Sequence, residues 1–226
     1  MILAVVGGKG GVGKSTVAYN LGAELDAVVV DADLAMADLP ASRGPDLHDV
    51  LAGRADATEA VREGAPVDVL PCGRSLSGAR ACEPTALVEA VERVKETYGR
   101  VVVDCPAGLS SDVGLGLLVA DASVLVTEPA PPALGDALRA RALARELDAG
   151  LATIVLNRAT DDAPTDLVAR ELGGPVTTVP ESDAVAEAQS VGVPVGERAP
   201  GAAATSAFAD AARTIERACR RVEPFG

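Results

Sequence analysis

A glycine-rich stretch near the start of the chain has the residue types and spacing needed to hold phosphate. Residues 8–15 read GKGGVGKS and match the pattern G-x-x-x-x-G-K-[ST]. Glycines let backbone N–H groups turn toward phosphate oxygens, and the N-terminus of a following helix adds partial positive charge. In this arrangement Lys14 neutralises the β and γ phosphates, and the Ser15 hydroxyl ligates Mg²⁺. The phosphate-holding residues predicted from the pattern are Gly8, Gly10, Gly11, Val12, Gly13, Lys14 and Ser15.

Acidic residues follow two apolar, β-branched runs, where a magnesium nucleotide needs carboxylates. Residues 28–33 read VVVDAD, so along an extended chain Asp31 and Asp33 share a face, and either can reach the metal or the attacking water. Residues 101–104 read VVVD, and a strand that ends in an acid such as Asp104 is the usual second acidic motif of phosphate-loop enzymes. Acids at strand ends also serve as helix caps or turn formers. Their place at the carboxyl ends of strands, where α/β proteins form their sites, favours the functional interpretation.

The elements that must position these residues alternate between short apolar strands and longer helices. This alternation predicts a three-layer α/β/α fold with a mostly parallel central sheet. The glycine-rich motif at residues 8–15 makes a P-loop NTPase the expected form of this fold. We expect one domain over 1–226, ending in an amphipathic helix at about 202–222. The strands are predicted at 2–6, 27–31, 67–71, 100–104, 122–127, 152–156 and 176–179. The helices are predicted at 15–25, 47–52, 84–98, 132–147, 164–172 and 202–222.

The composition restricts the partners. The net charge is -13 with an isoelectric point near 4.5, which opposes broad contact with nucleic-acid phosphates and makes DNA binding unlikely. Such an acidic balance is also typical of adaptation to a salty cytoplasm. The four cysteines form no Cys-x-x-Cys pair and His48 is the sole histidine, so the sequence indicates no local metal-ligand cluster and favours a reducing cytoplasm. We expect neither a signal peptide nor a membrane-spanning helix.

Several segments together resemble a known family. KGGVGKS at 9–15, DAD at 31–33 and DCPAG at 104–108 are similar to the motifs of the deviant Walker A ATPases, and within them of the MinD/ParA family. Further matches are LHDVLAG at 47–53, the Asn157-Arg158 pair after a predicted strand, PESDAV at 180–185 and Pro194-Val195. The resemblance covers nearly the whole chain, and it is nearest to archaeal MinD-like proteins.

The resemblance implies hydrolysis by a dimer. Lys9 corresponds to the signature lysine, which in this family crosses an ATP-bridged dimer to contact the partner's nucleotide, much as an arginine finger acts in trans. Together with Lys14 and with Asp33, which would position the hydrolytic water, it forms the expected catalytic set. The expected activity is an Mg²⁺-dependent ATPase that is slow without a protein partner or stimulator. The segment 130–136 matches the relatives' dimer face poorly, apart from Asp136.

The resemblance also implies how the metal and the base are held. Asp31 would support the metal shell and Asp104 would bind the metal through water, beside Ser15. Thr16 would join the phosphate contacts. Asn157 would hydrogen-bond the adenine, because an amide both donates to and accepts from a purine edge. The remaining nucleotide contacts expected are Arg158, Pro180 and Glu181.

Three functions follow from this family. The first is a MinD-like, ATP-dependent dimeric switch in spatial organisation of the cell, either division-site placement or positioning of polar or surface structures. The second is DNA partitioning of the ParA type, which the net charge opposes. The third is a metallocluster carrier or reductase of the same superfamily, for which Cys82 and Cys105 are the candidates. The last helix has a basic face with Arg213, Arg217, Arg220 and Arg221. This face suggests either peripheral membrane contact or, as we favour, a solvated face of a helix packed on the core.

Overall fold

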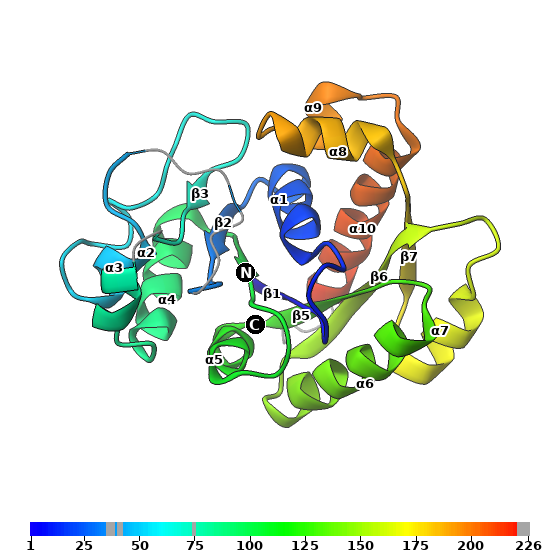
Figure 1. The fold of residues 1–226 in the computed structure, drawn as a ribbon, viewed down its shortest axis with the longest axis horizontal. Coiled ribbons are helices and arrows are strands. Elements are labelled where there is room, and N and C mark those ends of the chain that lie inside the picture. Colours follow the sequence, from blue (N-terminus) through cyan, green and yellow to red (C-terminus); the bar gives the residue numbers. More distant parts are fainter. Residues whose placement is uncertain (35–38, 40–42, 74–75, 221–226) are drawn as a thin grey trace.

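A seven-stranded parallel sheet forms the centre of the computed structural model, which describes residues 1–34, 39, 43–73 and 76–220 (Figure 1). The strand order is β3-β2-β4-β1-β5-β6-β7, and every neighbouring pair is parallel. The predicted α/β fold is confirmed, and the sheet is wholly parallel in these strands. The strands are β1 (Ile2–Val6), β2 (Val28–Asp31), β3 (Val69–Leu70), β4 (Val101–Asp104), β5 (Ala122–Thr127), β6 (Gly150–Ala159) and β7 (Val176–Pro180).

Helices cover both faces of the sheet, because successive side chains of the buried strands point to opposite sides. Ala4 and Val6 of β1 belong to one apolar cluster, whereas Leu3 and Val5 belong to the other. The first cluster is closed by α2 (Leu47–Leu51), α4 (Ala86–Tyr98), α5 (Ser111–Val119), α6 (Pro131–Glu146) and α7 (Thr165–Leu172). The second is closed by α1 (Lys14–Leu25), α8 (Asp183–Ser190), α9 (Val195–Arg198) and α10 (Ala203–Arg220). Helix α3 (Leu76–Ala81) packs beside α2.

The last helix, α10, lies against the sheet and α1 (Figure 1). Its apolar side buries Phe208 and Ile215, which are 1% and 0% exposed, and three arginines stand on its exposed side: Arg213, Arg217 and Arg220. Residues 221 and 222 of the predicted helix lie outside the described residues. Among the helices that the structure describes, none is both long enough and apolar enough to cross a membrane.

Several predicted boundaries were wrong. Strand β6 runs on to Ala159, because a bulge after Asn157 lets it continue past the predicted end. Strand β3 is only two residues long, since Asp68 and Pro71 of the predicted segment are poor strand formers. Helices α3, α5, α8 and α9 were not predicted from the sequence. These helices have four to nine residues, too few for a clear 3.6-residue period, and α5 also carries two glycines.

Candidate functional site

The glycine-rich loop connects the central strand β1 to the N-terminus of α1. Gly11 and Gly13 have φ of 85° and 89°, in the left-handed region where glycine is favoured. A Cβ atom on Gly13 would lie 2.3 Å from Asn157 Nδ2, so only a glycine fits at the start of α1. Without side chains at these positions, the backbone of the loop can approach neighbouring groups closely, as phosphate binding by backbone N–H groups requires.

Strand β6 holds the loop from one side. Asn157 is 8% exposed, and its Nδ2 donates a hydrogen bond to the Val12 carbonyl at 2.9 Å. Arg158 Nη1 donates to the Gly11 carbonyl at 2.9 Å and forms an ion pair with Glu128. The expectation that this pair follows a strand was wrong, because both residues lie within β6. Arg158 has φ 53° at the bulge, which lets two consecutive side chains reach the same loop.

Helix α6 packs on the other end of the loop. A Cβ atom on Gly8 would lie 2.0 Å from the backbone oxygen of Asp136, a contact that a larger residue cannot make. The next residue, Lys9, is exposed, and no ion pair or hydrogen bond of its side chain is found within the described part of the chain. The two lysines of the loop thus differ, since Lys14 is only 8% exposed.

Two buried carboxylates face Lys14 at the end of the sheet. Asp31 and Asp104 end the neighbouring strands β2 and β4 and are direct partners in the parallel register. They are 0% and 1% exposed. Asp33 is half-buried just beyond, and its backbone N–H donates to Asp31 Oδ1 at 3.3 Å. The structure thus places the three predicted acids together beside the loop.

The buried position of Asp104 is costly for its charged form. Burial, together with the charge of Asp31, raises the pKa of Asp104 to about 7, although the nearby Ser15 hydroxyl and Lys14 ammonium act in the opposite direction. Neither carboxylate oxygen makes a hydrogen bond of good geometry to the described residues. A buried acid with unsatisfied oxygens, next to another acid and a serine hydroxyl, is the donor set that Mg²⁺ prefers. The residues present therefore fit a magnesium ion.

A pocket of about 360 Å³ opens beside the loop. Its lining brings together five of the predicted nucleotide-binding residues: Thr16, Asn157, Arg158, Pro180 and Glu181. Helix α8 closes one side, where Thr16 Oγ1 donates to Gln189 Oε1 at 3.0 Å. Gln189 was not predicted as a site residue, since a lone glutamine in a short, unpredicted helix does not indicate a function. Glu128 and the packing of Asp136 on the loop were missed in the same way, because only tertiary structure brings them to the site.

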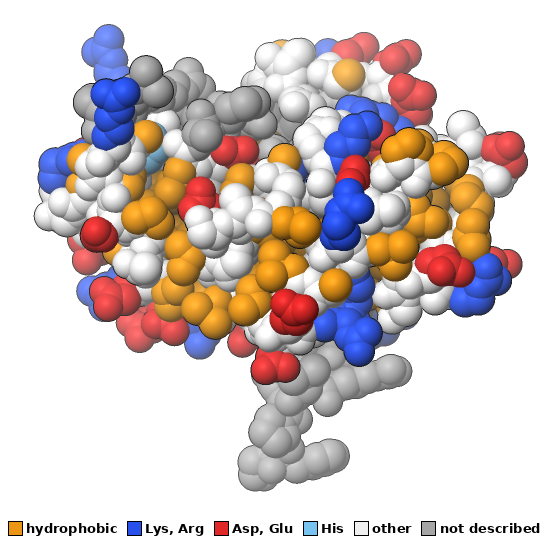
Figure 2. All heavy atoms as spheres, turned by 60° about the horizontal axis from the view of Figure 1, so that its bottom comes forward, with side chains coloured by type: hydrophobic (Ala, Val, Ile, Leu, Met, Phe, Trp, Pro, Cys, Tyr) orange, Lys and Arg blue, Asp and Glu red, His pale blue; other side chains and the backbone are white. Residues whose placement is uncertain are grey.

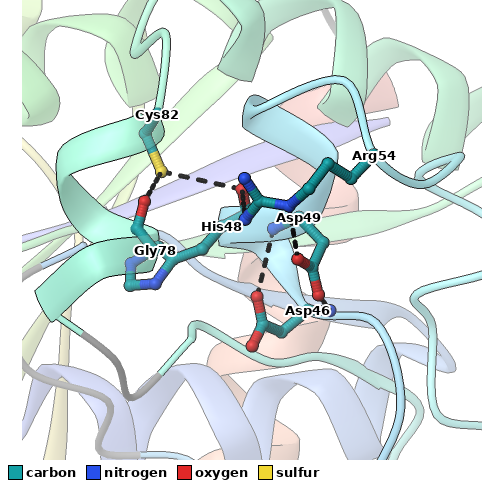
Figure 3. A network of polar contacts seen from close by, with 6 residues as sticks. All are labelled: Asp46, His48, Asp49, Arg54, Gly78 and Cys82. Carbon is teal, nitrogen blue, oxygen red and sulfur yellow. Dashed lines mark hydrogen bonds and ion pairs between the residues drawn. The ribbon is translucent and has the colours of Figure 1, made fainter.

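A second polar network lies beside the edge strands β2 and β3, around α2 (Figure 3). Asp46 and Asp49 form a reciprocal cap on this helix, and Arg54 Nε donates to Asp49 Oδ1 at 2.9 Å. His48 is 2% exposed, and its Nε2 lies 3.2 Å from the carbonyl of Leu34, directly after Asp33. The described residues contain no group of three or more acidic, histidine or cysteine ligands arranged to hold a metal.

The two cysteines proposed for a cluster have different immediate neighbours. Cys105 is 1% exposed, and burial strongly raises the pKa of its thiol. A Cβ atom on Gly116 would lie 2.6 Å from its sulfur, so Cys105 is packed tightly beneath α5. Cys82 Sγ instead lies near the carbonyls of Gly78 and His48 beside α2.

The fold and the loop define a P-loop protein of the α/β class. Residues 3–195 match the model of the CobQ/CobB/MinD/ParA nucleotide binding domain, and the chain belongs to this family.

Its relatives include archaeal proteins of similar length. An uncharacterised ATP-binding protein of Methanocaldococcus jannaschii is 32% identical over 94% of this chain and 86% of its own. The cell division ATPase MinD of Pyrococcus furiosus has a TM-score of 0.89 and 31% identity, over 96% of this chain and 98% of that one. The septum site-determining protein MinD of Pyrococcus horikoshii, in complex with Mg-ADP, has a TM-score of 0.88 and 28% identity, over 96% of each chain.

Proposed function

We propose that this protein is an Mg²⁺-dependent ATPase in which ATP joins two subunits and hydrolysis releases them. The observation that carries the proposal is the different placement of the two loop lysines. Lys14 is buried beside Asp104, where it can meet the phosphates of its own nucleotide. Lys9 is exposed and is available to a second subunit.

The nucleotide would span the loop and the pocket beside it. The loop residues from Gly8 to Thr16 would hold the phosphates, and Asn157, Arg158, Pro180 and Glu181 would surround the base. Ser15, Asp31 and Asp104 would hold Mg²⁺, which neutralises charge on the phosphate oxygens when it is bound. Asp33 would orient the attacking water, since it lies just beyond Asp31 at the carboxyl end of β2.

The loop and its supports would transmit the nucleotide state. Gly8 touches α6 directly, and the residues after Asp104 lead into α5, so changes at the phosphates reach both helices. Hydrophobic side chains gather on the face that carries these helices (Figure 2). Exposed leucines of this region are Leu109, Leu118 and Leu138. We propose this face as the place where the second subunit or another protein partner binds.

The cellular role that fits these features is spatial organisation, either of the division site or of polar or surface structures. Its support is the 31% identity to a cell division ATPase over nearly the whole chain. The net charge of -13 counts against a role that needs broad contact with DNA. We place the protein in the cytoplasm, with membrane contact only through a partner or a peripheral surface.

The two lysines give the test. Lys14→Ala should abolish ATP binding, measured by equilibrium titration, because the phosphates lose their buried counter-charge. Lys9→Ala should still bind ATP but should neither dimerise, measured by light scattering with MgATP, nor hydrolyse it. Lys95→Ala is the matched control, since Lys95 is exposed on α4, away from the site. Normal turnover by the Lys9→Ala variant would contradict the trans role.

Asp33→Ala tests the hydrolysis step that would release the two subunits. Without the residue that orients water, the ATP-bound dimer should form and persist, so light scattering should show a long-lived dimer with little phosphate release. Rapid hydrolysis by this variant would remove Asp33 from the catalytic set.

A further inference from the structure

The outer edge of the sheet at β7 is open in the described part of the chain. β7 is the last strand in the order and pairs only with β6 (Figure 1). Edge strands of this kind are usually protected by charged residues, proline, a bulge or a covering element. Residues 176–179 read VTTV and carry no charge, and Pro180 protects only the last position.

The pairing register shows which backbone groups face outward. Ile154 pairs with Val176, and its N–H donates to the Pro175 carbonyl at 2.8 Å. In a parallel ladder this geometry directs the N–H and C=O groups of Thr177 toward β6. The groups of Val176 and Thr178 therefore point away from β6, toward the open edge. Both residues can accept another strand.

A groove runs along this edge. It has a volume of about 880 Å³ and lies between the start of α7, the loop before it and one side of α10. The residues of α10 that line it run from Ala203 to Arg217, which is about 21 Å at 1.5 Å per residue. About six extended residues cover the same length. The groove therefore matches the length of one extended segment.

The charges in the groove indicate the chemistry of that segment. Asp210 already forms an ion pair with Arg213. Arg217 is exposed and takes part in no ion pair within the described part of the chain. Because α10 runs back along the sheet after β7, Arg217 lies toward the end of the groove where β7 begins. Asp161 lies toward the other end, where β7 leaves the sheet.

We propose that β7 binds an extended peptide of a protein partner by strand addition, with an acidic side chain of the peptide placed against Arg217. The peptide would pair with the N–H and C=O groups of Val176 and Thr178. Backbone hydrogen bonds would supply affinity, and the threonine- and alanine-lined walls would select small or β-branched side chains. This surface adjoins the nucleotide pocket at Pro180, which lines both. The backbone contacts proposed for the peptide lie at Val176 and Thr178, outside that pocket, and the proposal does not depend on the ATPase activity.

The experiment uses the whole purified chain without nucleotide and a displayed library of random short linear peptides as the probe. We expect enrichment of β-branched sequences that contain an acid. Thr178→Pro, which removes an outward N–H but no bond to β6, should weaken the best peptide about tenfold or more. Thr178→Val keeps the N–H and is the matched control. Arg217→Ala should weaken binding several-fold at low salt, whereas Arg220→Ala, outside the groove, should not.

Amide hydrogen exchange on the wild type gives a readout that needs no variant. The peptide should slow exchange at Val176 and Thr178, while Thr177 and Val179, already bonded to β6, should change little. Three results with the peptide would overturn the proposal: a library without enriched binders, peptides that bind Thr178→Pro as well as wild type, or protection of a different segment. A change of oligomeric state in the Thr178→Pro variant would assign the edge to a second copy and would also overturn it.

Discussion

Replacing Asp104 by Asn should remove a pH-dependent destabilisation of the nucleotide-free protein and should weaken magnesium binding. Burial raises the pKa of Asp104 from its usual 3.8 to about 7. The native state therefore holds this proton more tightly than the unfolded chain does, and stability falls as the pH rises from about 4 to about 7. The penalty is fully present above this range and disappears below it.

The magnitude follows from the size of the pKa change. A rise of about three units corresponds to roughly 4 kcal/mol, at about 1.4 kcal/mol per unit. At about pH 5 the carboxyl is protonated in the native state but mostly ionised in the unfolded chain. Folding must therefore take up a proton, which costs roughly 1.5 kcal/mol of stability at this pH. The stability difference between Asp104→Asn and wild type should therefore be roughly 2 to 3 kcal/mol more favourable to the variant at about pH 8 than at about pH 5.

The assay is urea unfolding at both pH values, with a metal chelator and a reducing agent, monitored by circular dichroism. Asp161→Asn is the matched control, because it makes the same chemical change at an exposed position. A buried Asn amide without partners carries its own cost, but that cost does not vary with pH. If the stability difference between Asp104→Asn and wild type were the same at both pH values, the reasoning about a buried, ionised carboxylate would be wrong. The variant should also bind MgATP more weakly by equilibrium titration.

Three further substitutions test the supports of the site. Gly8→Ala should lower the melting temperature and ATP turnover, because its Cβ would overlap the backbone of α6, whereas Gly10→Ala, whose Cβ would have 3.8 Å to its nearest neighbour, should change the melting temperature little; equal losses would refute the packing argument. Asn157→Ala should reduce the free energy of unfolding without nucleotide by about 1–3 kcal/mol, measured in urea, because the buried Val12 carbonyl loses its donor; an unchanged midpoint would contradict this. Phe208→Ala should cost about 3–5 kcal/mol in the same assay, since the ring is 1% exposed between α10 and the sheet, and a loss under about 1 kcal/mol would show that the helix contributes little.

The sequence was sufficient for the parts of the site that follow directly from strand ends. A parallel sheet aligns the carboxyl ends of its strands, so two apolar runs that each end in an acid predict neighbouring carboxylates. The register confirms this, because Asp31 and Asp104 are direct partners. The loop before α1 was predictable for the same local reason, since its glycines and its helix are contiguous in the chain.

The rest depends on contacts between distant segments. The bulge in β6 has no recognisable residue pattern, yet it decides that both Asn157 and Arg158 reach the loop. The contact of Gly8 with α6 depends on how this helix packs, which the pattern of residues 131–146 does not specify. The roles of these loop and β6 residues in ATP binding stay predictions, which the Gly8 and Asn157 variants above test.

These distant contacts also support the proposed role of the loop as a switch. A phosphate-binding loop that contacted only its own strand and helix could bind nucleotide without changing the conformation of the rest of the molecule. Here Gly8 contacts the backbone of α6. The carbonyls of Gly11 and Val12 accept hydrogen bonds from Arg158 and Asn157 of β6, and Arg158 also forms an ion pair with Glu128 after β5. Phosphate that draws the loop inward must therefore either break these contacts or move their partners. Because α6 also carries part of the exposed apolar face, the same movement would change the surface offered to a second subunit.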